Sequence, residues 1–72
     1  MGLNTRLLDV VALTVDLPKK GLVRGQVGTV VEILGAAAYE VEFSDDEGHT
    51  YAQAVVQLDE LLVLRYHPEL AA

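Results

Sequence analysis

Three closely spaced glycines, followed by a run rich in β-branched residues, constrain this chain more than any other feature. Gly21, Gly25 and Gly28 lie within eight residues, and the run from 29 to 34 follows at once. Glycine at such positions favours positive φ or a close approach between backbones, and β-branched residues favour strands. The stretch therefore predicts a tight loop that leads into a bent strand, as at the central hairpin of a small barrel.

Four further segments have strand character, and turn-forming residues separate them. Between 39 and 43 apolar side chains alternate with glutamates, the period of two that gives a strand one buried and one exposed face. Segments 7–15, 50–56 and 61–64 are rich in valine, leucine or other strand formers. Leu58 and Leu61 are spaced for a single 3-10 turn. We predict an all-β fold, a small five-stranded SH3-like barrel with a 3-10 turn before the last strand.

The chain has room for one small domain. Its 72 residues are 51% hydrophobic but include no tryptophan and no cysteine, so valine and leucine must build most of the core. We expect the barrel to cover residues 7–65 and residues 66–72 to form a flexible tail. A core of this size leaves homo-oligomerisation open as a way to bury more surface.

The sequence predicts a cytoplasmic protein. No apolar run approaches the roughly 20 residues that span a bilayer. The first residues lack the pattern of a signal peptide, and the absence of cysteine fits a reducing compartment.

The charges are unevenly distributed. The net charge is −6, yet three of the five basic residues, Lys19, Lys20 and Arg24, fall in one loop. Acids cluster between Glu32 and Glu47. Since binding to nucleic acid depends on neutralising phosphates with lysine and arginine, the balance disfavours nucleic acid as the main partner and favours another protein.

The sequence contains few residues that could act together in catalysis. Cysteine is absent, and Ser44, the only serine, shares a turn with His49 but has no third group to orient the pair. We therefore expect no enzyme activity, no catalytic residue and no cofactor. Tyr39, Tyr51 and Tyr66 are too few and too scattered to form a polyproline groove or a methyl-lysine cage.

The densest polar cluster is Asp45, Asp46, Glu47 and His49. Carboxylates beside a histidine can ligate a divalent cation, whereas acidic residues with glycine are also typical of a solvated hairpin turn. The cluster lacks the spacing of an EF-hand loop. We interpret it as a turn and predict no metal site.

Two resemblances extend this interpretation. Gly25-x-x-Gly28-Thr29-Val30-Val31, at the junction of loop and strand, resembles the core of the KOW motif. A larger set of residues covers most of the chain: Leu8 to Thr14, Asp16-Leu17-Pro18, Gly21-Leu22, Gly25 to Glu32, Tyr39 to Phe43 and Leu58-x-x-Leu61. The resemblance that this set carries is to the DUF4926 family, short bacterial proteins defined as a domain of unknown function. It implies an SH3-like fold and brings no activity, cofactor or site.

Three functions stay open. The first is a non-catalytic interaction module whose acidic face, formed by Glu32, Glu40 and Glu42, binds a basic protein, as an antitoxin, immunity protein or accessory subunit does. The second is a KOW-like domain associated with nucleic acid through Lys19, Lys20 and Arg24. The third is a structural domain that self-assembles through its surplus of apolar residues.

Overall fold

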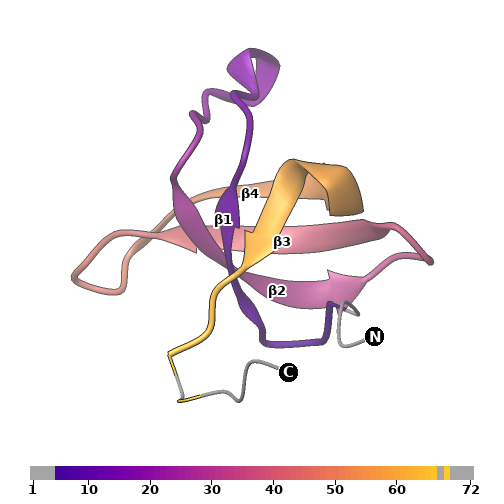
Figure 1. The fold of residues 1–72 in the computed structure, drawn as a ribbon. Helices are drawn as coiled ribbons and strands as arrows, with labels where there is room; N and C mark the ends of the chain where they lie inside the picture. Colours follow the sequence, from indigo (N-terminus) through magenta and orange to yellow (C-terminus); the bar gives the residue numbers. More distant parts are fainter. Residues whose placement is uncertain (1–4, 67, 69–72) are drawn as a thin grey trace.

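The computed structural model describes residues 5–66 and 68, which form a single antiparallel sheet with no α-helix. The tail predicted to be flexible, 66–72, lies outside these residues except for Tyr66 and Pro68, which are both exposed. The elements in chain order are β1 (Val10–Leu13), η1 (Pro18–Lys20), β2 (Val27–Ile33), β3 (Ala38–Ser44), β4 (Thr50–Gln57), η2 (Leu58–Glu60) and β5 (Leu61–Val63). The predicted five strands and the 3-10 turn before the last one are confirmed (Figure 1).

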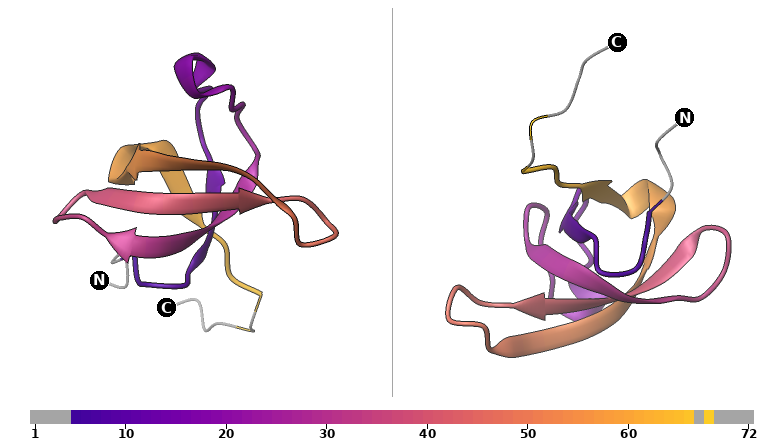
Figure 2. Two further views of the ribbon diagram at one scale, coloured as in Figure 1. Left: turned by 180° about the vertical axis from the view of Figure 1, so that it is seen from behind. Right: turned by 90° about the horizontal axis from the view of Figure 1, so that it is seen from below.

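The strands are ordered β4-β3-β2-β1-β5, so β4 and β5 are the two edges of an open sheet. Strands β2, β3 and β4 form one curved layer, and β1 and β5 cross it on its inner side (Figure 2). β2 belongs to both layers, because its first residues pair with β1 and most of its length pairs with β3. The core lies between the layers. Its buried residues are Val11, Leu13, Leu22, Val30, Tyr39, Val41, Phe43, Ala54, Val56 and Leu61.

The glycines do what the sequence predicts. Gly21 and Gly25 have φ of 70° and 93°, and both lie in the long loop between β1 and β2. Gly28 is buried where β2 passes close to β3, and a Cβ built there would lie 2.6 Å from Val41 Cγ1 and 2.9 Å from the Glu42 carbonyl oxygen. No side chain larger than hydrogen fits that contact without a shift of the backbone.

The loop between β1 and β2 carries η1 and stands away from the sheet on two chain segments (Figure 1). Its segments are joined by backbone hydrogen bonds, with Leu17 N donating to Leu22 O at 2.9 Å and Leu22 N donating to Leu17 O at 3.2 Å. Leu22 is 1% exposed and anchors the loop in the core. The position of this loop is therefore defined by packing as well as by its turns.

The first strand is shorter than the predicted 7–15. Residues 7 and 8 form a turn, in which Arg6 N donates to Asp9 Oδ2 at 2.8 Å and Asp9 N donates to Arg6 O at 3.1 Å. Leu8 adopts φ of 70°, which no strand residue has. At the other end the chain bends at Thr14 and Val15. Strand propensity alone did not reveal these local hydrogen bonds.

A β-bulge in β2 changes which face its later residues occupy. Val30 pairs with Val41, but the next pair is Glu32 with Glu40, so two steps along β2 match one step along β3. In a regular strand without a bulge, the period of two would place Glu32 on the same face as buried Val30. The bulge instead turns Glu32 outward.

Candidate interaction surfaces

The outer face of β2 and β3 carries three glutamates, Glu32, Glu40 and Glu42, which we call the acidic face. Glu40 and Glu42 alternate with the buried residues of β3, so they lie on the side of the sheet opposite the core. Glu32 is in register with Glu40 across the two strands. The three residues predicted from the sequence are therefore brought together on one surface.

The acidic face holds uncompensated like charge. Cross-strand neighbours have Cβ atoms about 5 Å apart, and like charges in such pairs are destabilising. Within residues 5–66, no lysine or arginine forms an ion pair with any of the three carboxylates. The flanking residues in register are Thr29 on β2 and Gln53 on β4, both neutral.

The three predicted basic residues lie on two segments of the loop between β1 and β2 and make different contacts. Lys19 and Lys20 lie on η1, and the Lys20 ammonium donates to the Val55 carbonyl of β4 at 2.6 Å. Arg24 lies on the return segment of the loop, where its backbone N–H donates to Asp16 Oδ1 at 2.9 Å. The Lys20 side chain thus already binds β4, and the Asp16 carboxylate holds the backbone of Arg24.

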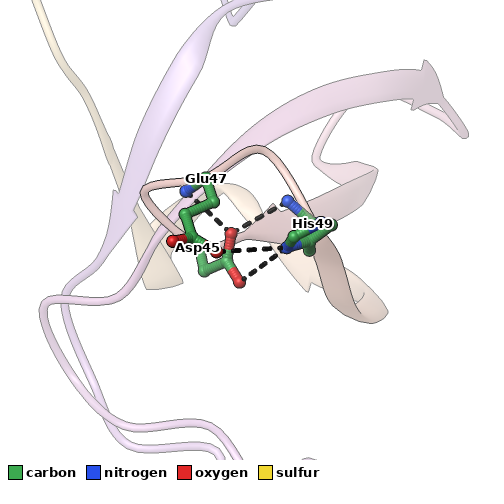
Figure 3. A group of neighbouring side chains, drawn as sticks. All are labelled: Asp45, Glu47 and His49. Carbon is green, nitrogen blue, oxygen red and sulfur yellow. Dashed lines mark hydrogen bonds and ion pairs between the residues drawn. The ribbon is translucent and has the colours of Figure 1, made fainter.

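The turn between β3 and β4 brings together Asp45, Glu47 and His49 (Figure 3). Asp45 Oδ1 accepts hydrogen bonds from the backbone N–H groups of Glu47 and His49, both at 2.9 Å. His49 Nδ1 lies 3.5 Å from Asp45 Oδ2 and 3.7 Å from Glu47 Oε1. The hydrogen bond from the His49 backbone, with smaller contributions from those of Glu47 and Gly48, lowers the pKa of Asp45 below its usual 3.8.

These contacts define a hairpin turn that is closed by an aspartate. One Asp45 oxygen is occupied by two backbone donors, which is the usual role of aspartate in a turn. Asp45, Glu47 and His49 are all exposed, and their ligand atoms lie within 4.8 Å of one another. Exposed acidic groups of this kind are common in turns, so the arrangement carries no metal assignment.

The remaining candidates lie apart from one another. Ser44 Oγ is 3.5 Å from Thr50 Oγ1, while His49 faces the carboxylates of its own turn. Tyr39 is buried, Tyr51 packs against Phe43 with ring centroids 6.5 Å apart, and Tyr66 is exposed. The structure therefore does not assemble Ser44 with His49, or the three tyrosines with one another.

A cavity of about 380 Å³ lies beside β5. Its lining residues are Thr5, Leu58, Leu61, Leu62, Val63 and Arg65. The lining is mainly apolar, and none of these residues is an acid, a histidine or a nucleophilic cysteine. The described part of its lining therefore contains no acid–base pair of the kind that catalysis requires.

Two features of these surfaces are absent from the sequence predictions. The bulge that places Glu32 beside Glu40 leaves no clear mark in a run of valines. The contact between Lys20 and Val55 joins residues 35 positions apart, and propensity has no access to such a separation.

The fold and its surfaces define a small all-β domain with an acidic sheet face and a long loop that contacts an edge strand through Lys20. The chain belongs to the family described as "Domain of unknown function (DUF4926)", whose model matches residues 7–63. The predicted family membership is therefore confirmed.

No curated protein and no solved structure matches the chain. The likeness to SH3-like barrels and to the KOW motif accordingly stays a prediction. In the described residues, no helix has the length and apolar composition needed to cross a membrane.

Proposed function

We propose that this domain is a non-catalytic interaction module that binds a basic protein through the acidic face of Glu32, Glu40 and Glu42. The observation that carries the proposal is the register of Glu32 with Glu40. The pair places like charges opposite each other, at a cost to stability of a few tenths to about 1 kcal/mol. The positive charges of a basic partner would attract both carboxylates and so offset the repulsion between Glu32 and Glu40.

The geometry of the acidic face supports this choice. The β2 bulge brings Glu32 to the surface where Glu40 and Glu42 already lie, and no lysine or arginine of residues 5–66 neutralises the three carboxylates by an ion pair. Electrostatic complementarity of this kind increases association rates and selects partners by charge. The proposal includes an antitoxin, an immunity protein or an accessory subunit, since each binds a partner without catalysis.

The two alternatives have less support. A KOW-like role would need Lys19, Lys20 and Arg24 to bind phosphates together, but Lys20 is engaged with the Val55 carbonyl. Self-assembly would use exposed apolar side chains such as Leu62, which is 58% exposed. Both alternatives are distinguished from the first by the experiment below.

The test is affinity capture from a native lysate at low and at high salt, with mass spectrometry and nucleic-acid staining of the eluate. The test variant is E32Q/E40Q/E42Q. The matched control is D46N/E47Q/D59N, which removes the same number of charges from exposed positions elsewhere. We expect a stoichiometric basic protein that binds the wild type and the control, is lost with the test variant, and is weakened by salt.

Other outcomes would redirect the proposal. Equal capture by the test variant and the control would remove the acidic face from the interaction. Recovery of nucleic acid, lost when Lys19 and Arg24 are replaced by alanine, would favour the KOW-like role. A protein that binds nothing and sediments as an oligomer would favour self-assembly.

A further inference from the structure

The free edge of β4 lies next to the acidic face and is partly covered by two side chains. β4 stands at one end of the strand order, so only its β3 side is paired. Lys20 Nζ donates to Val55 O at 2.6 Å, so that carbonyl points to the free edge. In an antiparallel ladder every second residue points the same way, so the backbone groups of Gln53 and Gln57 also face this edge.

The cover on this edge is incomplete. Gln57 N donates to Glu60 Oε1 at 2.9 Å, so the end of β4 near η2 is closed by Lys20 and Glu60. In the described part of the chain, no comparable side-chain hydrogen bond covers the backbone of Gln53. The loop that carries Lys20 stands above the β4 edge in the left view of Figure 2. An unpaired edge with exposed N–H and C=O groups is a template for another strand.

The register connects this edge to the acidic face. Gln53 pairs with Glu42, and Val55 pairs with Glu40. A strand added antiparallel to β4 would place the residues opposite Gln53 and Val55 on the same outer face as those glutamates. The added strand would lie roughly 10 Å from β3, which is two strand spacings. Lysine or arginine at those positions can reach the two carboxylates across β4.

We infer that the β4 edge accepts an extended protein segment with lysine or arginine at every second position, and that this segment displaces Lys20 from the Val55 carbonyl. The inference rests on the proposed function, because it assigns the binding mode of the basic partner. Backbone hydrogen bonds to Gln53 and Val55 supply part of the affinity, and the acidic face selects basic side chains. Lys20 is then a competitor for the site and makes no favourable contact with the partner.

The probe is a capped eight-residue peptide in which threonine and lysine alternate. Residues directly opposite Gln53 and Val55 share their face, so in this binding mode the lysines themselves donate the backbone hydrogen bonds to β4. The matched control peptide has the same sequence with every lysine backbone nitrogen methylated, which keeps the charge and removes those donors. Affinity is measured by calorimetry at low ionic strength, and the amide signals of Gln53 and Val55 are followed by NMR.

The expected results are specific to each part of the proposal. The methylated peptide binds at least about tenfold more weakly, because two backbone hydrogen bonds are lost. E40Q/E42Q weakens the unmodified peptide by roughly tenfold, since each surface ion pair contributes a factor of up to about five. K20A strengthens binding by about two- to tenfold, because one competing hydrogen bond is removed. K19A is the control and leaves the affinity unchanged.

The outcomes that would overturn the inference differ from those that would overturn the proposed function. Equal affinity for the two peptides would show that the edge is not used, while a loss in E40Q/E42Q would still support the acidic face. A lack of binding by either peptide would exclude strand addition, and the lysate experiment would decide separately on the basic partner. A dimer of the wild type or of K20A in sedimentation, with β4 amides protected, would assign the edge to a second copy instead.

Discussion

Replacement of Gly28 by alanine tests whether the sheet requires close contact between β2 and β3. The new Cβ would lie 2.6 Å from Val41 Cγ1, 2.9 Å from the Glu42 carbonyl oxygen and 3.0 Å from Phe43 Cδ2. The Val41 side chain can change its rotamer, but the Glu42 carbonyl oxygen belongs to a paired strand and can move only with the backbone. We therefore expect the loss typical of an overpacked core, about 1 to 3 kcal/mol in the free energy of unfolding.

The size of this effect is measurable in a domain of this length. A chain of 72 residues has a total stability of roughly 4 to 11 kcal/mol. A loss of 1 to 3 kcal/mol would lower Tm by about 4 to 24 °C, at 4 to 8 °C per kcal/mol. Urea unfolding followed by far-UV circular dichroism would show a lower midpoint with an unchanged slope, since the variant should keep the same fold.

Substitutions at two other glycines distinguish destabilisation by a steric clash from destabilisation by an unfavourable φ. Gly25 has φ of 93° and open space around it, so Gly25→Ala should cost about 1 to 2 kcal/mol through φ alone. Gly35 has neither a positive φ nor a neighbour within 4 Å, so Gly35→Ala should be neutral or stabilise by about 0.4 to 1 kcal/mol. If Gly28→Ala were as stable as Gly35→Ala, the argument from close approach would be wrong.

Three further changes test the anchor, the acidic face and the turn. Leu22→Ala should lower the free energy of unfolding by about 2 to 5 kcal/mol in urea titration, because this 1% exposed side chain holds the long loop in the core; a loss under 1 kcal/mol would contradict that role. Glu32→Lys should raise stability by about 0.2 to 1 kcal/mol, because it pairs opposite charges with Glu40, and should weaken capture of the basic partner; a destabilised variant would argue against like-charge repulsion. The folded pKa of Asp45 is lowered, so its contribution to stability is present above pH 3.8 and is lost as pH falls through the folded value. In NMR the carboxyl carbon signal of Asp45 should titrate with a midpoint below pH 3.8, and the amide signal of His49 should lose the matching step in Asp45→Asn, whereas an Asp45 midpoint above pH 3.8 would contradict the hydrogen-bond assignment.

Much of the fold could be predicted from the sequence, because strand alternation and glycine turns depend on residues that are close together in the chain. The alternation of β3 needs only the two faces of a strand, and the positive φ of Gly21 and Gly25 needs only the absence of a Cβ. The first strand was predicted too long for the same reason. Propensity registers leucine and valine but not the hydrogen bonds that close a turn between Arg6 and Asp9.

The acidic face was predicted from the sequence with all three glutamates, but the regular period of a strand accounts for only two of them. Glu40 and Glu42 follow from the period of β3, whereas the same period in β2 places Glu32 with buried Val30. An extra residue in β2 resolves that conflict, since a buried unpaired carboxylate would cost far more than a bulge. The result is a surface with Glu32 directly opposite Glu40.

In the basic loop, residues that are close in sequence make contacts in different places. Lys19, Lys20 and Arg24 are close in sequence, yet the loop directs Lys20 to the Val55 carbonyl, 35 residues away. A charge that covers the edge of β4 protects the sheet against uncontrolled pairing. That contact also places the Lys20 ammonium at the edge carbonyl of Val55, the residue in register with Glu40. In the proposed binding mode, a basic segment that replaces the Lys20 ammonium would supply charge to Glu40 and backbone donors to β4 at once.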